Sequence, residues 1–493
     1  MYLIGYDIGS SSIKAALVDA GSKSTVAVVQ SPLQEMDILS PQSGWAEQHP
    51  ETWWEHTCTT TKKLLQKTGA QPAEIKGIGI AYQMHGLVLV DKNHQPLRPS
   101  IIWCDSRAVA IGKRAFEAIG PEKCLSHLLN PPGNFTASKL KWVQYHEPEI
   151  YEKAWKVMLP GDYIAMKLTG EIRTTPGGLS EGILWDFKEN EIAQFVLDYF
   201  QFDRLLFPEV VPACSPQGFV TKAAAEATGI KEGTPVTYRA GDQPNNAMSL
   251  NVLQPGEIAA TGGTSGVVYG VVARPVSDPQ SRVNGFAHVN HTAASPHIGI
   301  LLCINGAGIQ YSWVRQHFAG GIISYGDMEK MAAAIPVGSD GLCILPFGNG
   351  AERMLGNRDM GSRICNLRFN RHTQAHYFRA ALEGIAFSFV YGIRILQGMG
   401  LDMRIMRAGN DNLFQSAIFS STISNLTGIR IELIATTGAA GAAKAAGVAT
   451  GIYNSLEEAM QGSEIVQGWE PNDSVELYLK AYRDWEKELT KQL

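Results

Sequence analysis

Short apolar runs separated by small and polar residues mark the beginning of the chain. They predict three consecutive strands that form a meander, at residues 2–6, 13–19 and 25–30. A helix is predicted at 50–67, where large side chains recur in a broadly helical arrangement (Trp53, Trp54, Thr57, Leu64). Residues 75–80 return to a strand pattern. This alternation of strands and helices is typical of an α/β fold.

The strand-turn-strand pattern of the first residues returns near the middle of the chain. A strand, a turn of small residues and a second strand are predicted at 256–260, 261–265 and 267–272. Two halves that open with similar hairpins predict two related domains facing each other across a cleft. We expect the join near residues 240–255, and therefore an N-terminal domain over 1–244 and a C-terminal domain over 245–493.

The end of the chain predicts an amphipathic helix at residues 474–489. Its large apolar residues share one face, with charged residues elsewhere (Tyr478, Tyr482, Trp485, Leu489). A helix of this kind buries its apolar stripe, so we expect it to dock on a core as a closing helix.

The composition is that of an ordered globular protein. Of the 493 residues 45% are hydrophobic and 9% aromatic, which is ample for roughly two to four domains. The formal net charge is −5 and there is no long basic run, so nucleic acid is not an expected partner. The start lacks the basic flank and cleavage site of a signal peptide, and no apolar run is expected to span a bilayer. We expect a cytoplasmic protein with no membrane partner.

The seven cysteines show neither a disulfide framework nor a zinc site. They are odd in number and contain no CxxC pair. Cys104 stands beside candidate site residues, but a small buried hydrophobic residue is the simpler interpretation, and we assign it no chemistry.

The turn after the first strand has the composition of a phosphate-binding loop. Gly9 and three hydroxyl residues, Ser10, Ser11 and Ser12, leave backbone N–H groups open to a polyphosphate, and Lys14 adds a positive charge. Asp7 is an unusual companion for an anion unless a cation lies between them, and Mg²⁺ held by one carboxylate and waters would do this. An ordinary Gly/Ser hairpin with a solvated aspartate explains the turn equally well.

The second hairpin turn and the strand before it strengthen the first interpretation. Gly263, Thr264 and Ser265 offer a similar small, donor-rich surface, so two turns could hold adjacent phosphates of one nucleotide. Asp242 follows an apolar strand and would lie at the cleft between the halves, where phosphoryl transfer to a hydroxyl needs a carboxylate to accept the proton. Taken alone, Asp242 is more simply explained as a turn residue in a Gly-Asp-Gln-Pro bend.

Several stretches in the same order resemble the FGGY family of carbohydrate kinases over nearly the whole chain. Residues 7–14 resemble the family's phosphate hairpin, residues 256–265 resemble its second phosphate loop, and Asp242 matches its catalytic aspartate. Further stretches resemble the family at residues 44–48, 135–140, 159–163 and 168–170. The resemblance implies an α/β fold of two ribonuclease-H-like domains, the actin-like ATPase fold, facing a central cleft.

Two segments look most like the sugar-binding segments of family members that act on xylulose. They are Gln83-Met84-His85-Gly86 and the stretch from Trp103 to Arg107 that includes Asp105. The resemblance implies that Met84 and His85 touch the sugar. The chemistry agrees, because an imidazole can bond to a hydroxyl and an indole can cover an apolar sugar face. His85 as a satisfied core histidine, and Asp105 with Arg107 as a structural ion pair, are the alternatives.

Within this resemblance the nucleotide is expected to lie against Gly306, Gly409 and Asn410. The stretch 408–412 is Ala-Gly-Asn-Asp-Asn, whereas the family usually has a glycine triplet there, so the nucleotide preference is open. We expect ATP and Mg²⁺ to serve a ketopentose kinase, with D-xylulose phosphorylated on its terminal hydroxyl.

Other functions of the same fold are kept as alternatives. They are a kinase for L-ribulose or gluconate, a non-catalytic sugar or nucleotide sensor, and a chaperone-like ATPase. The presence of both Asp7 and Asp242 argues against a non-catalytic sensor. The expected partners are a small sugar and ATP, and a homodimer is left open.

Overall fold

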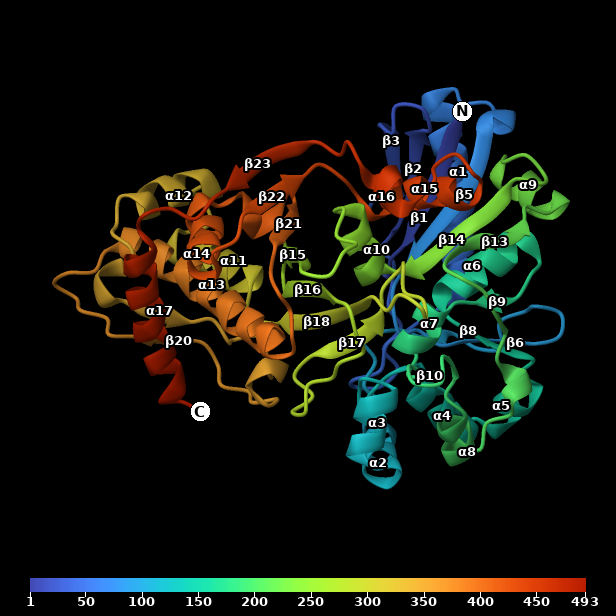
Figure 1. The fold of residues 1–493 in the computed structure, drawn as a ribbon, viewed down its shortest axis with the longest axis horizontal. Helices are drawn as coiled ribbons and strands as arrows, with labels where there is room; N and C mark the ends of the chain where they lie inside the picture. The colour runs from blue at the N-terminus through green and yellow to red at the C-terminus, as the bar shows by residue number, and fades with distance from the viewer.

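A computed structural model describes residues 1–493, which form two lobes, each built around one mixed β-sheet (Figure 1). The first sheet has the strand order β13 (Cys214–Phe219), β14 (Pro235–Gly241), β5 (Ile75–Tyr82), β1 (Tyr2–Ile8), β2 (Ile13–Asp19), β3 (Thr25–Ser31). The second has the order β17 (Asn284–Ala287), β18 (Ile298–Ile304), β16 (Gly266–Val272), β15 (Glu257–Gly262), β21 (Ile405–Gly409), β22 (Ile431–Ile434), β23 (Ile465–Trp469).

The helices cover these sheets and fill the ends of both lobes. In the first half they are α1 (Pro50–Thr68), α2 (Val109–Ile119), α3 (Pro121–His127), α4 (Thr136–His146), α5 (Pro148–Lys153), α6 (Pro160–Thr169), α7 (Pro176–Glu181), α8 (Gln194–Phe200), α9 (Lys222–Thr228) and α10 (Asp242–Ser249). In the second half they are α11 (Gly308–Phe318), α12 (Tyr325–Ala333), α13 (Gln374–Gly398), α14 (Ala417–Thr427), α15 (Gly438–Ala449), α16 (Leu456–Met460) and α17 (Val475–Thr490).

Short pairs of strands and single helical turns complete the chain. The strands are β4 (Glu47–Gln48), β6 (Val88–Val90), β7 (Ser100–Ile101), β8 (Lys156–Met158), β9 (Arg173–Thr174), β10 (Trp185–Asp186), β11 (Glu191–Ile192), β12 (Glu209–Val210), β19 (Cys343–Leu345) and β20 (Arg363–Cys365). The 3₁₀ turns lie at Pro72–Glu74, Arg204–Leu206, Ser339–Gly341, Arg353–Leu355 and Asn412–Gln415.

The two sheets repeat one plan, as the paired hairpins in the sequence predict. In the first, β1 pairs antiparallel with β2 and parallel with β5, and β5 pairs parallel with β14. In the second, β15 pairs antiparallel with β16 and parallel with β21, and β21 pairs parallel with β22. This shared order is the one expected for two ribonuclease-H-like domains.

The predicted strands begin within a residue of the observed ones, but three of them, β1, β5 and β15, run two residues further than predicted. Strand β1 continues to Ile8 and strand β15 to Gly262, whereas the sequence pattern placed both strand ends before these residues. Asp7 is therefore a strand residue paired with Lys14, because the ladder to β2 continues to the Ile8–Ile13 pair. The tight turn is reduced to residues 9–12 in the first hairpin and 263–265 in the second.

Helix α15 returns from the second half of the sequence to the first sheet. It packs on β1, β5 and β14 (Figure 1). A Cβ atom at Gly5 would lie 1.9 Å from the Ala439 carbonyl oxygen, and one at Gly79 would lie 2.0 Å from that of Ala442. Only glycine permits so close an approach of helix to sheet. The linear division at residues 244 and 245 therefore does not separate the lobes in space.

A segment of the second half also reaches the first lobe. Strand β17 lies beside α7, and the Ala287 N–H donates to Ser180 Oγ at 3.0 Å. The side-chain amide of Asn130 donates to the Gly285 carbonyl at 2.7 Å and accepts from the Gly285 N–H at 3.0 Å. One hydrophobic cluster accordingly contains residues of both halves.

The closing helix is confirmed as α17. Tyr478, Tyr482, Trp485 and Leu489 are all buried, and the Trp485 indole N–H donates to the Ile344 carbonyl at 2.9 Å. This bond anchors the helix to β19 at the base of the second lobe.

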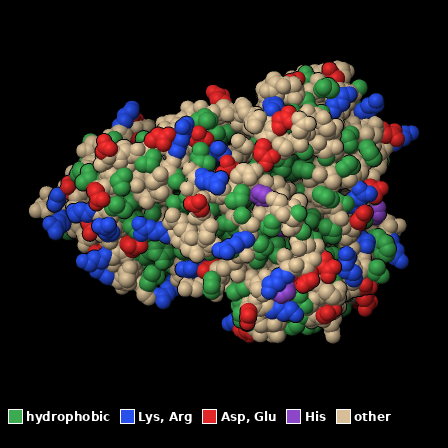
Figure 2. Space-filling model, viewed as in Figure 1, with side chains coloured by type: hydrophobic (Ala, Val, Ile, Leu, Met, Phe, Trp, Pro, Cys, Tyr) green, Lys and Arg blue, Asp and Glu red, His purple; other side chains and the backbone are tan.

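One helix meets the length and composition of a membrane span, contrary to the expectation from the sequence. Helix α13 has 25 residues and a mean hydropathy of 1.2, but 83% of its apolar window is buried inside the protein. It is the core helix of the second lobe, and its few charged side chains include the buried Arg379–Glu383 pair. On the face shown in Figure 2, basic and acidic side chains are interspersed over both lobes.

Candidate functional site

The three parallel strands of the first sheet end at one edge, and the predicted site residues gather there. Ile8 pairs with Tyr82, and Tyr82 pairs with Gly241, so these strand ends lie at one level. Asp7, Gln83 and Asp242 flank this level. Ligands of α/β sheets bind at the carboxyl ends of parallel strands, which makes this edge the candidate site.

Asp7 and Asp242 are two carboxyl groups whose pKa values are both raised. Both side chains are half-buried. Burial and, second, the charge of Asp7 together raise the pKa of Asp242 to about 7, while backbone N–H groups at the start of α10 oppose the shift. Burial also raises the pKa of Asp7, which Lys14 lowers. A shift of this kind is common at functional sites.

The first turn is fixed from several sides and stays open toward the cleft. The Gly9 N–H donates to the Ser12 carbonyl, and the Gln48 side chain donates to the Ser10 carbonyl at 2.7 Å. The Trp103 indole N–H donates to Ser10 Oγ at 3.3 Å, although 54% of the Trp103 surface is exposed. Trp103, the first residue of the second candidate sugar segment, thus contacts the phosphate turn.

The segment after β5 is packed against the residue that precedes Asp242. Gln83 is buried, and its N–H donates to the Ile8 carbonyl at 2.8 Å. The Gln83 side-chain oxygen is buried without a hydrogen-bond partner. A Cβ atom at Gly241 would lie 2.6 Å from Met84 Cγ, so Met84 is in direct contact with the chain next to Asp242. The structure brings Gln83, Met84 and Asp242 together.

His85 is held as a neutral ring of one tautomer. Its Nδ1 lies 2.9 Å from the Glu181 carbonyl oxygen, which only accepts, so Nδ1 carries the proton and Nε2 keeps a free lone pair. Burial and the charge of Lys139 lower the His85 pKa to about 3, so its 3.6 Å approach to the Glu181 carboxyl is not an ion pair. Phe135 and Phe286 pack on the ring at 4.7 and 5.4 Å between centroids.

A cavity lies in the other lobe beside the second turn. Its volume is about 640 Å³ and it begins at Gly262, Gly263 and Thr264. The Gly308 N–H donates to the Gly263 carbonyl at 2.9 Å, and the Ile309 N–H to that of Thr264 at 3.1 Å, which joins the turn to the start of α11. The cavity is completed by Tyr311, Ser312, Tyr325, Gly326, Glu329, Asn412, Leu413, Gln415 and Ser416.

The other expected nucleotide residues lie near this cavity without lining it. Ser265 completes the turn, Gly409 is the last residue of β21, and Asn410 follows it. The Asn410 carbonyl accepts from the cavity residue Gln415 at 3.1 Å. Gly306 is packed on the Pro346 backbone, and its N–H donates to Glu352 at 2.8 Å. This packing requires glycine at 306, and the expected contact of Gly306 with a nucleotide stays a prediction.

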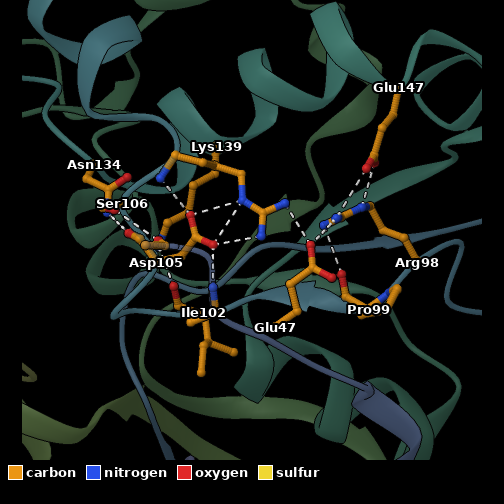
Figure 3. A network of polar contacts seen from close by, with 12 residues as sticks. Glu47, Arg98, Pro99, Ile102, Asp105, Ser106, Asn134, Lys139 and Glu147 are labelled. Atoms are coloured by element: carbon orange, nitrogen blue, oxygen red, sulfur yellow. Dashed lines mark hydrogen bonds and ion pairs between the residues drawn. The ribbon is translucent and has the colours of Figure 1, made fainter. Parts of the chain in front are cut away.

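Asp105 does not face the cleft, which corrects the expectation that it binds the sugar. It is fully buried, and its carboxylate accepts from the Arg107 guanidinium at 2.7 Å and from the Ala46 N–H at 2.6 Å. Arg107 in turn pairs with Glu47 at 2.7 Å. The alternative of a structural ion pair is the one that the structure supports (Figure 3).

Several residues of the site carry no signal in the sequence. Glu181 contacts His85, yet it stands in a short helix without a recognisable motif. Phe286 comes from the other half of the chain and looks like any strand residue. Gly308 and Ile309 could have been found from the Gly-Ala-Gly stretch that opens α11, since a glycine-rich helix start favours phosphate.

The site fits a divalent cation shared with phosphates better than one enclosed by protein. No group of three or more histidine, cysteine, aspartate or glutamate side chains surrounds a common point. Asp7 and Asp242 are two partly buried carboxylates with Lys14 as a nearby cation. Magnesium commonly keeps several waters and one or two carboxylates beside substrate phosphates, which is compatible with Asp7 as its protein ligand.

Asn245 and Gly438 connect this carboxylate pair to α15. The Asn245 side-chain amide donates to the Gly438 carbonyl at 3.0 Å. A Cβ atom at Gly438 would lie 3.1 Å from Asp7 Oδ2 and 3.4 Å from Asn245 Nδ2. The beginning of α15 thus lies directly beside Asp7.

Comparison with known proteins agrees with this geometry. Residues 2–249 match the N-terminal domain, and residues 258–450 the C-terminal domain, of the FGGY family of carbohydrate kinases. The xylulose kinase of Bacillus subtilis is 28% identical over 93% of this chain and 90% of its own. The L-xylulose/3-keto-L-gulonate kinase of Escherichia coli is 30% identical over the same shares.

Solved structures of the same fold include enzymes with different sugars in their names. The xylulose kinase of Rhodospirillum rubrum superposes with a TM-score of 0.88 at 24% identity, covering 100% of this chain and 99% of that one. The gluconate kinase of Lactobacillus acidophilus has a TM-score of 0.89 at 22% identity, covering 99% and 98%. Both domain matches together span most of the residues, and the chain therefore belongs to the FGGY family of carbohydrate kinases.

Proposed function

We propose that the protein transfers the γ-phosphoryl group of ATP to the terminal hydroxyl of a ketopentose, with D-xylulose as the substrate and D-xylulose 5-phosphate as the product. The observation that carries the proposal is the Asp242 carboxyl, which follows β14 beside Met84 and has a pKa raised to about 7. The similarity to xylulose kinases supports the choice of sugar. A cytoplasmic location is proposed with it.

Asp242 is the general base of this proposal. Its carboxylate takes the proton of the attacking hydroxyl as that oxygen bonds to the γ-phosphorus. The bond from phosphorus to the bridging oxygen breaks, and ADP leaves with its electron pair. A carboxyl with a pKa near 7 is a stronger base than an ordinary aspartate and is still about half ionised at neutral pH.

His85, Met84 and Trp103 orient the sugar. The free Nε2 lone pair of His85 accepts a hydrogen bond from a sugar hydroxyl, and the low pKa of the ring keeps it neutral. Trp103 offers an exposed indole face next to the phosphate turn, which suits the apolar face of a sugar.

ATP is assigned to the cavity beside α11 and to the two turns. The cavity of about 640 Å³ is within the usual range for a ligand of this size. The turns at 9–12 and 263–265 offer backbone N–H groups and hydroxyls to the phosphates. Asp7 would hold Mg²⁺ through water, and the ion would neutralise charge on the transferring phosphoryl group.

A panel of acceptors in an ADP-release assay tests the choice of substrate. D-xylulose is expected to give the highest kcat/KM among D-xylulose, L-xylulose, L-ribulose, gluconate and glycerol. A tenfold preference requires only about 1.4 kcal/mol of transition-state binding, so the ranking depends on few contacts. A tenfold preference for gluconate or glycerol would overturn the assignment.

Two of these acceptors also represent a second candidate function. The relatives include a kinase named for L-xylulose and 3-keto-L-gulonate and a structure named for gluconate kinase. A non-catalytic sensor would instead bind sugar and nucleotide without ADP release, which calorimetry on the same panel detects.

A further inference from the structure

Lys139 is a fully buried lysine that the proposed mechanism does not use. It lies on α4, and its Nζ donates to the His85 carbonyl at 2.8 Å and to the Ile102 carbonyl at 2.9 Å. Burial lowers its pKa to about 7, although the charge of Asp105 opposes this. Burying an ammonium group is costly unless the group is bonded, so two carbonyl bonds from one buried lysine call for an explanation.

The two carbonyls belong to the two segments that face the sugar. His85 is the centre of the first segment, and Ile102 directly precedes Trp103 in the second. Figure 3 shows Lys139 and Ile102 next to Asp105, whose backbone carbonyl accepts from the Asn134 side chain. A single ammonium group therefore ties both segments to α4.

His85 has a backbone conformation that needs outside support. Its φ angle is 63°, in the left-handed region that residues other than glycine rarely adopt. Such conformations persist at functional sites where the surroundings hold them. Here the His85 N–H donates to the Glu181 carboxyl at 3.0 Å, and the His85 carbonyl accepts from Lys139. Both ends of the residue are thus fixed by buried side chains.

We propose that Lys139 and Glu181 form a clamp that holds His85 in its left-handed conformation, so that Nε2 faces the sugar, and that Lys139 also sets the position of Trp103. Both are positioning residues, because they act on the sugar through His85 and Trp103. The expected effect on the KM for the sugar rests on the proposed function. The expected effect on the rigidity of the two segments does not depend on which substrate is used.

The test compares Lys139→Met with Lys141→Met. Lys141 is a matched control on the same helix, since it is also buried and its Nζ donates to Gln144 Oε1 at 2.6 Å and to the Phe200 carbonyl at 2.8 Å. Neither partner belongs to the sugar segments. Both substitutions remove a buried ammonium group and keep an unbranched apolar side chain. They differ chiefly in the backbone segments whose hydrogen bonds are lost.

Lys139→Met is expected to raise the KM for D-xylulose at least tenfold. The KM for ATP should change much less than the KM for D-xylulose, because the nucleotide cavity is in the other lobe and only the Trp103 bond to Ser10 connects this clamp to the first phosphate turn. Lys141→Met should change none of these values by more than twofold. A general loss of folding would instead affect the sugar and the nucleotide alike.

Hydrogen exchange is measured without sugar, so its result does not depend on the substrate assignment. It therefore shows whether the clamp proposal fails even if the proposed substrate is wrong. Backbone amides of residues 83–86 and 102–107 should exchange at least tenfold faster in Lys139→Met than in the wild type or Lys141→Met, with no sugar present. If Lys139→Met does not fold, Lys139→Gln is measured in its place, since its shorter side chain keeps a polar end. Unchanged exchange in both segments, or unchanged sugar KM with an active enzyme, would overturn the clamp.

Discussion

Asp242 links activity and stability because its raised pKa affects both. Activity needs the ionised form, so kcat/KM should rise with pH and be half-maximal near pH 7. The free energy of unfolding has the opposite pH dependence. The native carboxyl keeps its proton up to about pH 7, whereas the unfolded carboxyl loses it near 3.8, so the native state loses stability as pH rises through this range.

Asp242→Asn removes the ionisable group and should therefore be more stable than the wild type at pH 8. We expect the free energy of unfolding to rise by about 1–3 kcal/mol relative to the wild type. The rise is limited because the Asp242 side chain is only half-buried, so solvent lowers the cost of its charge. The gain should shrink toward zero at pH 4. Denaturant unfolding in the presence of a chelator measures it, with Asp473→Asn, an exposed aspartate, as the control. A gain independent of pH would contradict the assigned ionisation.

At the residue scale the sequence located the strand-end residues but not their supports. Asp7 and Asp242 stand at the ends of apolar strands, the first two residues before Gly9 and the second directly after Gly241, which is a local pattern. Glu181 and Lys139 act through buried contacts with His85, and those contacts depend on the packing of helices α4 and α7. The local sequence around Asp105 was equally compatible with sugar binding. Only its burial in the structure showed that it forms an ion pair with Arg107.

At the scale of elements, local periodicity predicted the strands well and their ends less well. Strand β2 and helix α1 were placed within a residue of their observed bounds, because apolar and polar positions change sharply there. Strands β1 and β15 run further than predicted, since hydrogen bonds to their partner strands extend them through small residues. Pairing of this kind is a long-range effect that a local pattern does not contain.

Helix α15 is a further case in which packing decides the role of an element. Its run of alanines and glycines indicates a buried helix but not the sheet that it covers. Gly5 and Gly79 on the first sheet provide the close approach. The complementary glycines lie more than 350 residues away in sequence, roughly the length of two domains, so the contact had no visible signal.

At the scale of the whole molecule, the two lobes carry different parts of one proposed site. The sugar segments and the first phosphate turn lie on the first lobe, and the nucleotide cavity and second turn on the other (Figure 1). One nucleotide can contact both turns only if the lobes approach each other. Closure would also exclude water from the γ-phosphate, which limits hydrolysis.

Small-angle scattering tests this closure. The radius of gyration should fall when D-xylulose and a non-hydrolysable ATP analogue are added together, and fall less with the sugar alone. Strand β17 is bonded to Asn130 and Ser180 of the first lobe, so we expect the lobes to rotate about that contact rather than separate. An unchanged radius with both ligands would count against a closing mechanism.

The most direct test of the central claim is the turnover of Asp242→Asn. The amide keeps the shape of the side chain but does not accept a proton at neutral pH, so kcat with the preferred sugar should fall by about 10² to 10⁴. The dissociation constants of sugar and ATP, measured by calorimetry, should change little, and thermal melts should show a folded protein. Turnover within a few-fold of the wild type would contradict the assignment of Asp242 as the base.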